Sequence, residues 1–262
     1  MNLFIAPFVN ALFGCYYLVG NFGWAIVLVT VALKLVLLPL IWPSLKSANK
    51  TREIQPKLNK LKEKYGSDKQ GLAKAQMELY KAEGINPLSG CLPQILQIVV
   101  LLLFFSAFNL VTGFSGNGQK GSINEINAQL IPSFKISEGF NFNLNYFGSD
   151  LALSPAKVFS KGITADLILP LVLLLGSGIL QFFSAKIMMP NPKVDEKIVE
   201  KTKDKEDDMM AAMRTQSLYM MPAMTIFIGW NFSMGLLLYW FANSVLMIGQ
   251  QVLVNKISKK KP

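Results

Sequence analysis

The chain has 262 residues, of which 52% are hydrophobic and only 16% are charged. Soluble domains carry about 25% charged residues, and here Asp, Glu, Lys and Arg are absent from three long stretches, 1–33, 84–119 and 215–255. A soluble fold would have to bury all three stretches in one core, whereas a bilayer accommodates them directly. The composition therefore excludes an ordinary soluble domain and predicts an all-α integral membrane protein.

The net charge of +10 does not by itself indicate a nucleic-acid-binding protein. The basic residues lie between apolar segments, where they meet the anionic headgroups of a cytoplasmic leaflet, so we expect no sequence-specific contact with nucleic acid. The chain has no histidine, and Cys15 and Cys91 lie in apolar segments without metal-ligand spacing. No nucleophile–base pair stands out. We therefore expect no metal site, no cofactor and no enzymatic activity.

Apolar windows divide the chain into five predicted membrane spans, since crossing about 30 Å of hydrocarbon takes roughly 20 helical residues. The last charge-free stretch contains two of them, separated by a break at residues 229–233. The predicted spans are 21–42, 88–112, 166–189, 215–232 and 233–255. The segments around them are 1–20, 43–87, 113–165, 190–214 and 256–262.

The distribution of Lys and Arg predicts the orientation of these spans. Segments 43–87, 190–214 and 256–262 carry ten, six and four of these residues, whereas 113–165 carries four across 53 residues. Five spans place the three basic segments on one side, which the positive-inside rule assigns to the cytoplasm. The N-terminus is then outside, and the basic C-terminal tail is cytoplasmic.

The segments outside the spans differ in character. Residues 1–20 are apolar, contain Pro7 and lack Lys and Arg, which favours an interfacial helix on the outer face over a cleaved signal peptide. Residues 113–165, rich in Gly, Asn, Ser and Phe, indicate an irregular outer loop with one short hairpin. Six of the twelve methionines fall between Met209 and Met224, where they either pack in the bundle or form an adaptable surface for apolar segments.

A cytoplasmic helical hairpin is predicted for residues 43–87. Apolar residues recur at helical spacing before and after the turn Gly66-Ser67-Asp68, and lysines occupy the other faces. This pattern is typical of a solvated basic pair of helices. It does not by itself say what the hairpin contacts.

Lys34 lies midway through the first predicted span. A cation at the bilayer centre costs about 2.5–3.5 kcal/mol on insertion scales and normally faces a bundle interior, a partner or water. No Asp or Glu lies at the same depth, so we predict a hydrated cavity around Lys34. The polar residues that we expect to line this cavity are Thr30, Gln94, Gln97, Gln181, Asn243 and Ser244. For each of them alone the simpler interpretation is an interhelical hydrogen bond, worth about 0.6 kcal/mol.

With these residues in view, the chain resembles the YidC/Oxa/Alb family of membrane protein insertases over nearly its whole length. The most specific segment is 79–93, which reads LYKAEGINPLSGCLP, and 235–240, GLLLYW, is similar to the family's last span. Lys34 stands where the family usually has Arg, and Lys loses its charge more readily than Arg when it is desolvated. Asn243 and Ser244 stand in the reverse of the usual order.

The resemblance implies a groove that opens to the cytoplasm and to lipid and is closed on the outer side, in a protein of the bacterial plasma membrane. Lys34 would attract acidic or polar segments of nascent membrane proteins, and their apolar helices would leave along the second and fourth spans. The hairpin would make the first contact, through Gln55, Pro56, Lys57 and Tyr80. The implied partners are nascent membrane proteins, the lipid bilayer, the ribosome and the Sec translocon.

Two other classes of protein fit part of the pattern. A small anion or solute transporter using Lys34 usually shows inverted repeats, and we find no convincing repeat in this sequence. A structural subunit of a membrane complex is compatible with the basic hairpin, but it leaves the central lysine unexplained.

Overall fold

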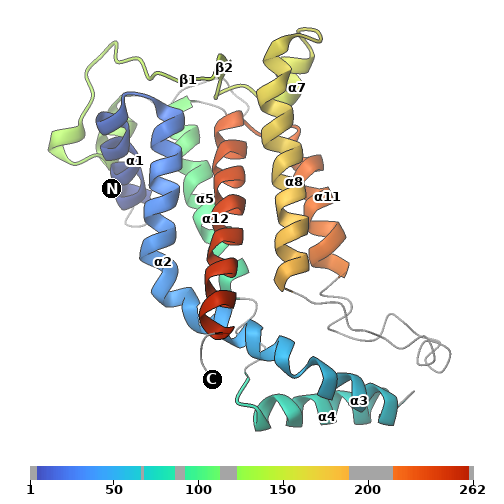
Figure 1. The fold of residues 1–262 in the computed structure, drawn as a ribbon. Coiled ribbons are helices and arrows are strands. Elements are labelled where there is room, and N and C mark those ends of the chain that lie inside the picture. Colours follow the sequence, from blue (N-terminus) through green and yellow to red (C-terminus); the bar gives the residue numbers. More distant parts are fainter. Residues whose placement is uncertain (1–4, 66–67, 86–91, 113–122, 189–214, 260–262) are drawn as a thin grey trace.

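The bundle is built from long helices that run between two ends of the molecule (Figure 1). The computed structural model describes residues 5–65, 68–85, 92–112, 123–188 and 215–259. Its principal helices are α1 (Ile5–Val19), α2 (Phe22–Glu53), α3 (Gln55–Tyr65), α4 (Lys69–Ala82), α5 (Leu92–Thr112), α8 (Ile168–Met188), α11 (Met221–Gly229) and α12 (Met234–Lys259). Shorter elements between α5 and α8 are α6 (Ile123–Gln129), η2 (Pro132–Phe134), β1 (Asn145–Tyr146), β2 (Ser149–Asp150), α7 (Pro155–Phe159) and η3 (Ala165–Leu167).

Within the described residues, four helices are long and apolar enough to cross a membrane, namely α2, α5, α8 and α12. Their outward faces carry large apolar side chains that are more than half exposed, such as Val36, Leu102 and Ile179. Contiguous exposed apolar surface marks contact with lipid or with another apolar partner. The structure therefore confirms the all-α membrane class, and these four helices cover the predicted first, second, third and fifth spans.

The predicted fourth span, 215–232, is only partly accounted for. Its described part consists of a π-helical segment, η4 (Gln216–Met220), followed by α11 and by a turn at Trp230. The 14 residues of η4 and α11 together rise about 21 Å at 1.5 Å per residue, still short of about 30 Å of hydrocarbon. Five spans therefore stay a prediction.

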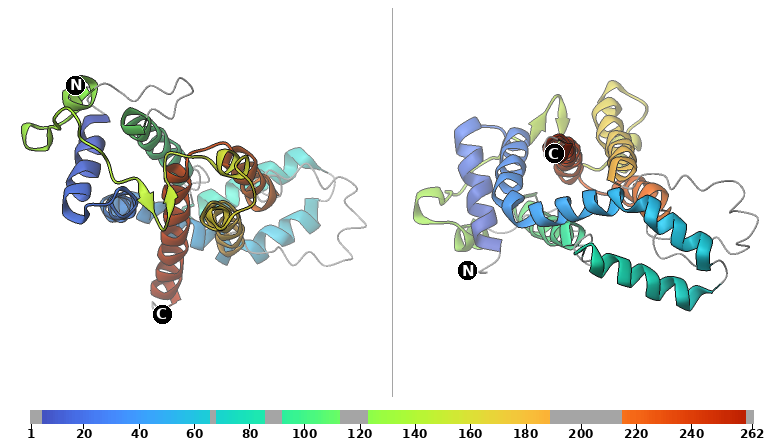
Figure 2. Two further views of the ribbon diagram at one scale, coloured as in Figure 1. Left: turned by 90° about the horizontal axis from the view of Figure 1, so that it is seen from above. Right: turned by 60° about the horizontal axis from the view of Figure 1, so that its bottom comes forward.

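Helix α12 occupies the centre of the bundle. It packs between α2 and α8, while α11 packs against α8 and α1 against α2 (Figures 1 and 2). On α5, the ring of Phe104 stacks on that of Tyr239 of α12 with the centroids 4.7 Å apart. One turn from Tyr239, a Cβ added to Gly235 would lie 2.2 Å from a ring atom of Phe108. The absent side chain at Gly235 thus lets α5 and α12 approach closely.

Residues 123–167 fold over one end of the bundle, and we call this segment the cap. The carbonyls of Leu153 and Leu151 accept hydrogen bonds from the N–H groups of Met234 and Gly235, at 2.7 and 2.9 Å. The first N–H groups of a helix have no carbonyl partner within that helix, so the cap satisfies two of them in α12. Apolar side chains of the cap also join those of α1, α2, α5 and α12 in one core.

The cap is more ordered than the irregular loop predicted for this region. The predicted short hairpin is confirmed: β1 and β2 pair antiparallel, with Tyr146 opposite Ser149. Buried cap residues such as Ile126, Ile136 and Leu151 follow neither a helical nor a strand period, which is why the local pattern does not predict their burial.

Helix α2 extends beyond the predicted end of the first span. It continues through Pro39 and Pro43 to Glu53 and bends in its second half (Figure 1). Proline removes a main-chain hydrogen bond and commonly kinks a helix instead of ending it. The predicted boundary between span and hairpin at residue 43 therefore falls inside α2, and the helix breaks only at Ile54.

Helices α3 and α4 pack side by side at the end of the molecule away from the cap (Figure 2). The predicted turn residues Gly66 and Ser67 lie outside the described residues. Asp68 caps α4, because its Oδ1 accepts a hydrogen bond from the N–H of Gly71 at 3.0 Å. The buried residues between the two helices form a small apolar cluster of Ile54, Leu58, Tyr80 and Ile85.

We expect Leu58→Ala to open the α3–α4 pair. Leu58 is 2% exposed, and truncating a buried leucine costs about 2–5 kcal/mol. Trypsin should then cleave α3 and α4 several times faster in membrane-bound protein. Glu83→Gln is the matched control, since it breaks the solvent-accessible ion pair with Lys57, and such pairs contribute about 0–1 kcal/mol. Equal cleavage rates for Leu58→Ala and wild type would show that the cluster does not hold the helices together.

Candidate functional site

The centre of the candidate site is Lys34 on α2. It lies twelve residues after Phe22, the first residue of α2, which at 1.5 Å per residue is about 18 Å along the helix axis. That depth is near the middle of about 30 Å of hydrocarbon. The side chain is half-buried. In the described ranges no carboxylate pairs with it, and the ion pair found there joins Lys57 to Glu83.

Two of the predicted groove residues use their hydroxyl groups within their own helices. Thr30 Oγ1 donates to the carbonyl of Ile26 at 2.6 Å, and Ser244 Oγ donates to that of Trp240 at 2.9 Å. Such bonds to the preceding turn satisfy a hydroxyl inside an apolar helix. Thr30 lies one turn before Lys34, on the same face of α2. It adds a polar group to that face, but its hydroxyl is already hydrogen-bonded and does not indicate a bound ligand.

Two predicted groove residues make hydrogen bonds between helices. Gln97 Nε2 on α5 donates to the hydroxyl of Tyr239 on α12 at 2.9 Å. Gln181 Oε1 on α8 accepts a bond from Thr225 Oγ1 on α11 at 2.8 Å. Each amide therefore makes the interhelical hydrogen bond that the simpler interpretation expects. The side chain of Gln94, the third predicted amide, lies outside the described part of the chain.

Asn243 on α12 differs from the other predicted groove residues. It is 4% exposed, and its Oδ1 has no hydrogen-bond partner among the described residues. An unsatisfied buried acceptor costs about 1–3 kcal/mol, so this position favours water or another polar group as a neighbour. Two turns further along α12, Gln250 Nε2 donates to the carbonyl of Lys34 at 3.5 Å. Polar side chains of α12 are therefore found on both sides of the level at which α12 contacts Lys34 of α2.

Three polar residues that the sequence pattern does not single out take part in these contacts. Tyr239 and Thr225 bind Gln97 and Gln181, and Asn49 Oδ1 accepts from Gln251 Nε2 at 3.3 Å. Each carries a hydroxyl or an amide in or beside an apolar run, and this is the only feature of the local sequence that could have pointed to a polar contact. Their partners lie 44 to 202 residues away along the chain.

A double-mutant cycle on Gln97 and Tyr239 measures whether their bond is structural. We expect Gln97→Leu and Tyr239→Phe each to lower the stability of the bundle by about 0.6–1.7 kcal/mol. The double variant should lose less than the sum, because both changes remove the same bond. The readout is the free energy of unfolding in detergent, with Val245→Ala at an exposed position of the same helix as the control. Strictly additive losses would show that the bond contributes no coupling energy.

The predicted capture residues of the hairpin have unequal access to a partner. Lys57 is exposed and pairs with Glu83, and Pro56 is exposed in the first turn of α3. Gln55 Nε2 donates to Asn59 Oδ1 at 3.4 Å. Tyr80 is buried in the cluster between α3 and α4, so its ring supports the hairpin from inside. A capture role for these four residues stays a prediction.

The fold and the site together define the class of this protein. Helices that cross a bilayer surround amides, hydroxyls and one lysine at membrane depth. Among the residues that the structure describes, no cluster of His, Cys, Asp and Glu side chains could hold a metal ion. This is a multi-span membrane protein with a polar site inside the membrane.

Comparison with known proteins identifies the family. Residues 14–261 match the family described as 60Kd inner membrane protein. The chain is 32% identical over 242 residues to the membrane protein insertase YidC of Pelobacter propionicus, covering 92% of this chain and 36% of that protein. It is also 32% identical over 249 residues to the YidC of Legionella pneumophila strain Corby (94% and 34%), and 28% identical over 253 residues to that of Citrifermentans bemidjiense (95% and 36%). The chain belongs to the 60Kd inner membrane protein family, the YidC/Oxa/Alb family, and it spans about a third of the length of these relatives.

Proposed function

We propose that the chain is a membrane protein insertase that moves short hydrophilic segments of nascent membrane proteins across the bilayer. The relatives bear the name insertase and align with over nine-tenths of this chain. The observation that carries the proposal is Lys34, a cation in the middle of a membrane-spanning helix with no carboxylate partner in the described residues. A charge in that position is costly and normally serves a function.

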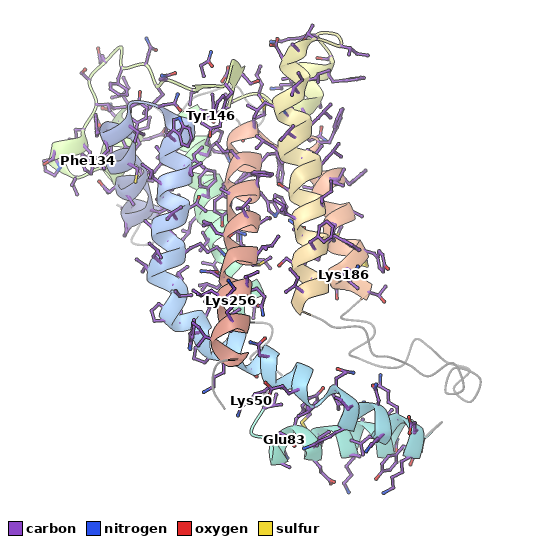
Figure 3. The ribbon with its side chains drawn as sticks, viewed as in Figure 1. Lys50, Glu83, Phe134, Tyr146, Lys186 and Lys256 are labelled. Carbon is purple, nitrogen blue, oxygen red and sulfur yellow. The ribbon has the colours of Figure 1, made fainter. Side chains whose placement is uncertain are left out.

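The proposed topology has five spans, with the N-terminus outside and the C-terminus in the cytoplasm of a bacterium. Lys50, Lys186 and Lys256 lie toward the end of the bundle opposite Tyr146 (Figure 3). The positive-inside rule assigns the basic end to the cytoplasm. The hairpin then projects into the cytoplasm, and the cap with α1 lies on the outer side.

In the proposed mechanism Lys34 attracts an acidic or polar segment of the substrate from the cytoplasm. Two opposite unit charges 4 Å apart interact by about 4 kcal/mol at an effective dielectric constant of 20. An Asp at the centre of a span costs about 2.5–3.5 kcal/mol on insertion scales. Because the two energies are similar, one lysine offsets the transfer of one acidic residue without trapping it. Water beside Thr30 and Asn243 would lower the desolvation cost further.

The apolar helix of the substrate then leaves the groove along α5 and α11. The side chains of Ile98, Leu102, Met224 and Phe227 on these helices are 49% to 81% exposed. Methionine side chains adapt to varied apolar partners. Each CH₂ group transferred to hydrocarbon contributes about 0.8 kcal/mol, so entry of the helix into lipid drives the process without a nucleotide.

The hairpin makes the first contact with the substrate in this scheme. Lys60, Lys64 and Lys74 are exposed on α3 and α4 and present positive charge to the cytoplasm. This surface suits acidic segments of nascent chains, and it also suits the ribosome and the Sec translocon as further partners.

Reconstitution tests the proposed function. Proteoliposomes containing the purified chain receive a single-span substrate with a short outer tail, and protease protection measures the inserted fraction. We expect insertion several times above that of empty liposomes and of liposomes containing an unrelated multi-span protein. Insertion at the level of the empty liposomes would refute an autonomous insertase, and chloride flux would then test the transporter alternative.

A further inference from the structure

A cleft lies between the β1–β2 hairpin of the cap and the segment formed by η3 and the first turns of α8. Its volume is about 350 Å³, near the lower end of the range of about 300–1,000 Å³ that is usual for ligand sites. It shares no residue with the groove proposed around Lys34. Its two walls come from the β1–β2 hairpin and from η3 and α8, and the residues that matter here are Phe147, Ser149, Asp166, Ile168, Leu169 and Val172.

The cleft is continuous with an apolar stripe on α8. Ile168, Val172, Leu175 and Ile179 are 65%, 52%, 45% and 55% exposed, and their spacing places them on one face of the helix. Helix α8 with η3 is long and apolar enough to span a membrane, so this stripe faces hydrocarbon. A ligand with an acyl chain can therefore reach the cleft by moving along the bilayer.

The polar end of the cleft carries one negative charge. Asp166 is the only charged side chain among the residues that line it in the described structure. It precedes the first residue of α8 by one turn or less, at the level where a span meets the headgroups. A cationic headgroup placed there would pair with the carboxylate, whereas an anionic one would be repelled.

Phe147 stands at the opposite wall in an unusual conformation. Its φ is +48°, a left-handed value that is rare for bulky residues, and its side chain is 74% exposed. Its ring lies edge-on to that of Tyr146 with centroids 4.7 Å apart, and 6.3 Å from that of Trp24. Trp and Tyr are enriched at the membrane interface, and the rings of Trp24 and Tyr146 beside Phe147 place it at that level, where its ring can cover the glycerol region of a lipid.

We propose that this cleft binds one phospholipid of the outer leaflet whose headgroup carries a primary ammonium group. The ammonium group lies against the Asp166 carboxylate, and the upper part of one acyl chain follows Ile168 and Val172. The volume of about 350 Å³ accommodates a headgroup and the beginning of a chain, while the rest of the lipid stays in the bilayer. Three N–H donors let a primary ammonium donate hydrogen bonds to a carboxylate in addition to the charge attraction, whereas a quaternary ammonium has no N–H donor.

Native mass spectrometry of the full chain in detergent tests the site. Phosphatidylethanolamine, phosphatidylcholine and phosphatidylglycerol with identical acyl chains are added in turn. We expect one phosphatidylethanolamine to bind with a Kd about tenfold lower than that of phosphatidylcholine, and Asp166→Asn to remove this preference, a change of about 1.4 kcal/mol. Glu138→Gln, which neutralises an exposed carboxylate elsewhere on the cap, should leave the preference intact.

A second variant separates the shape of the cleft from its charge. Ala165 also lines the cleft, so Ala165→Trp fills the cleft while keeping Asp166 and should weaken binding of all three lipids. Equal affinities of the three lipids for wild type, or a preference that survives Asp166→Asn, would overturn the proposal. Tighter binding of phosphatidylglycerol would also overturn it, since phosphate recognition would then replace recognition of the ammonium group.

Discussion

Lys34→Ala is expected to slow insertion of a short-tailed substrate by about tenfold or more when the tail is acidic, and by much less when it is neutral. Removing the lysine removes an attraction of up to about 4 kcal/mol between it and a carboxylate, and each 1.4 kcal/mol that is lost at the slow step lowers the rate about tenfold. With a neutral tail, Lys34→Ala removes only a polar neighbour of the tail and no charge attraction, so the rate should fall much less. The measurement is the initial rate of protease protection in proteoliposomes that contain equal amounts of each variant.

Two further variants distinguish charge at Lys34 from other effects. Lys34→Arg keeps the cation and should retain most of the activity with the acidic tail. Lys186→Ala removes an exposed cation near the C-terminal end of α8 and should have little effect on either tail. If Lys34→Ala impaired acidic and neutral tails equally, or if Lys34→Arg were as slow as Lys34→Ala, the electrostatic mechanism would be wrong.

Gly235→Ala is expected to destabilise the bundle through a single added methyl group. The new Cβ would lie 2.2 and 2.3 Å from two ring atoms of Phe108, far inside van der Waals contact. Phe108 is 1% exposed and stacks on Phe104, so it cannot move aside without displacing the core. Overpacking of this kind costs about 1–3 kcal/mol, which should appear as a lower melting temperature in detergent.

Gly249→Ala is the matched control for this prediction. Gly249 lies on the same helix, and a Cβ there would meet no atom within 4 Å. Because alanine favours a helix by about 0.8–1.0 kcal/mol relative to glycine, the control should be neutral or slightly stabilising. Phe108→Leu added to Gly235→Ala should restore part of the stability. Equal melting temperatures for the two alanine variants would contradict the close packing of α5 on α12.

The long helices were predictable because the bilayer imposes both their length and their composition. Apolar windows of about 20 residues therefore predicted α2, α5, α8 and α12 without any knowledge of their contacts. The end of α2 was less predictable. Pro43 suggested a boundary, but a proline can be accommodated in a bent helix, and α2 continues to Glu53.

The candidate site was predictable only in part. Lys34 could be identified because a cation inside an apolar membrane span is energetically costly and therefore rare. The partners of Gln97 and Gln181 depend on how distant helices are rotated against each other, and no local pattern encodes that rotation. The same limit applies to the cap, where the carbonyl of Gln129 accepts a hydrogen bond from Asn10, 119 residues earlier.

The most direct test of the proposed mechanism asks from which side water reaches position 34. Lys34→Cys is made in a background in which Cys15 and Cys91 are replaced by alanine, and a membrane-impermeant maleimide is added to either face of sealed vesicles. We predict labelling from the cytoplasmic face only, since in the proposed mechanism the groove opens there and the cap closes the other side. Labelling from the outer face would contradict a hydrated groove open to the cytoplasm. The same holds if position 34 is not labelled while Lys46→Cys, nearer the C-terminal end of α2, reacts.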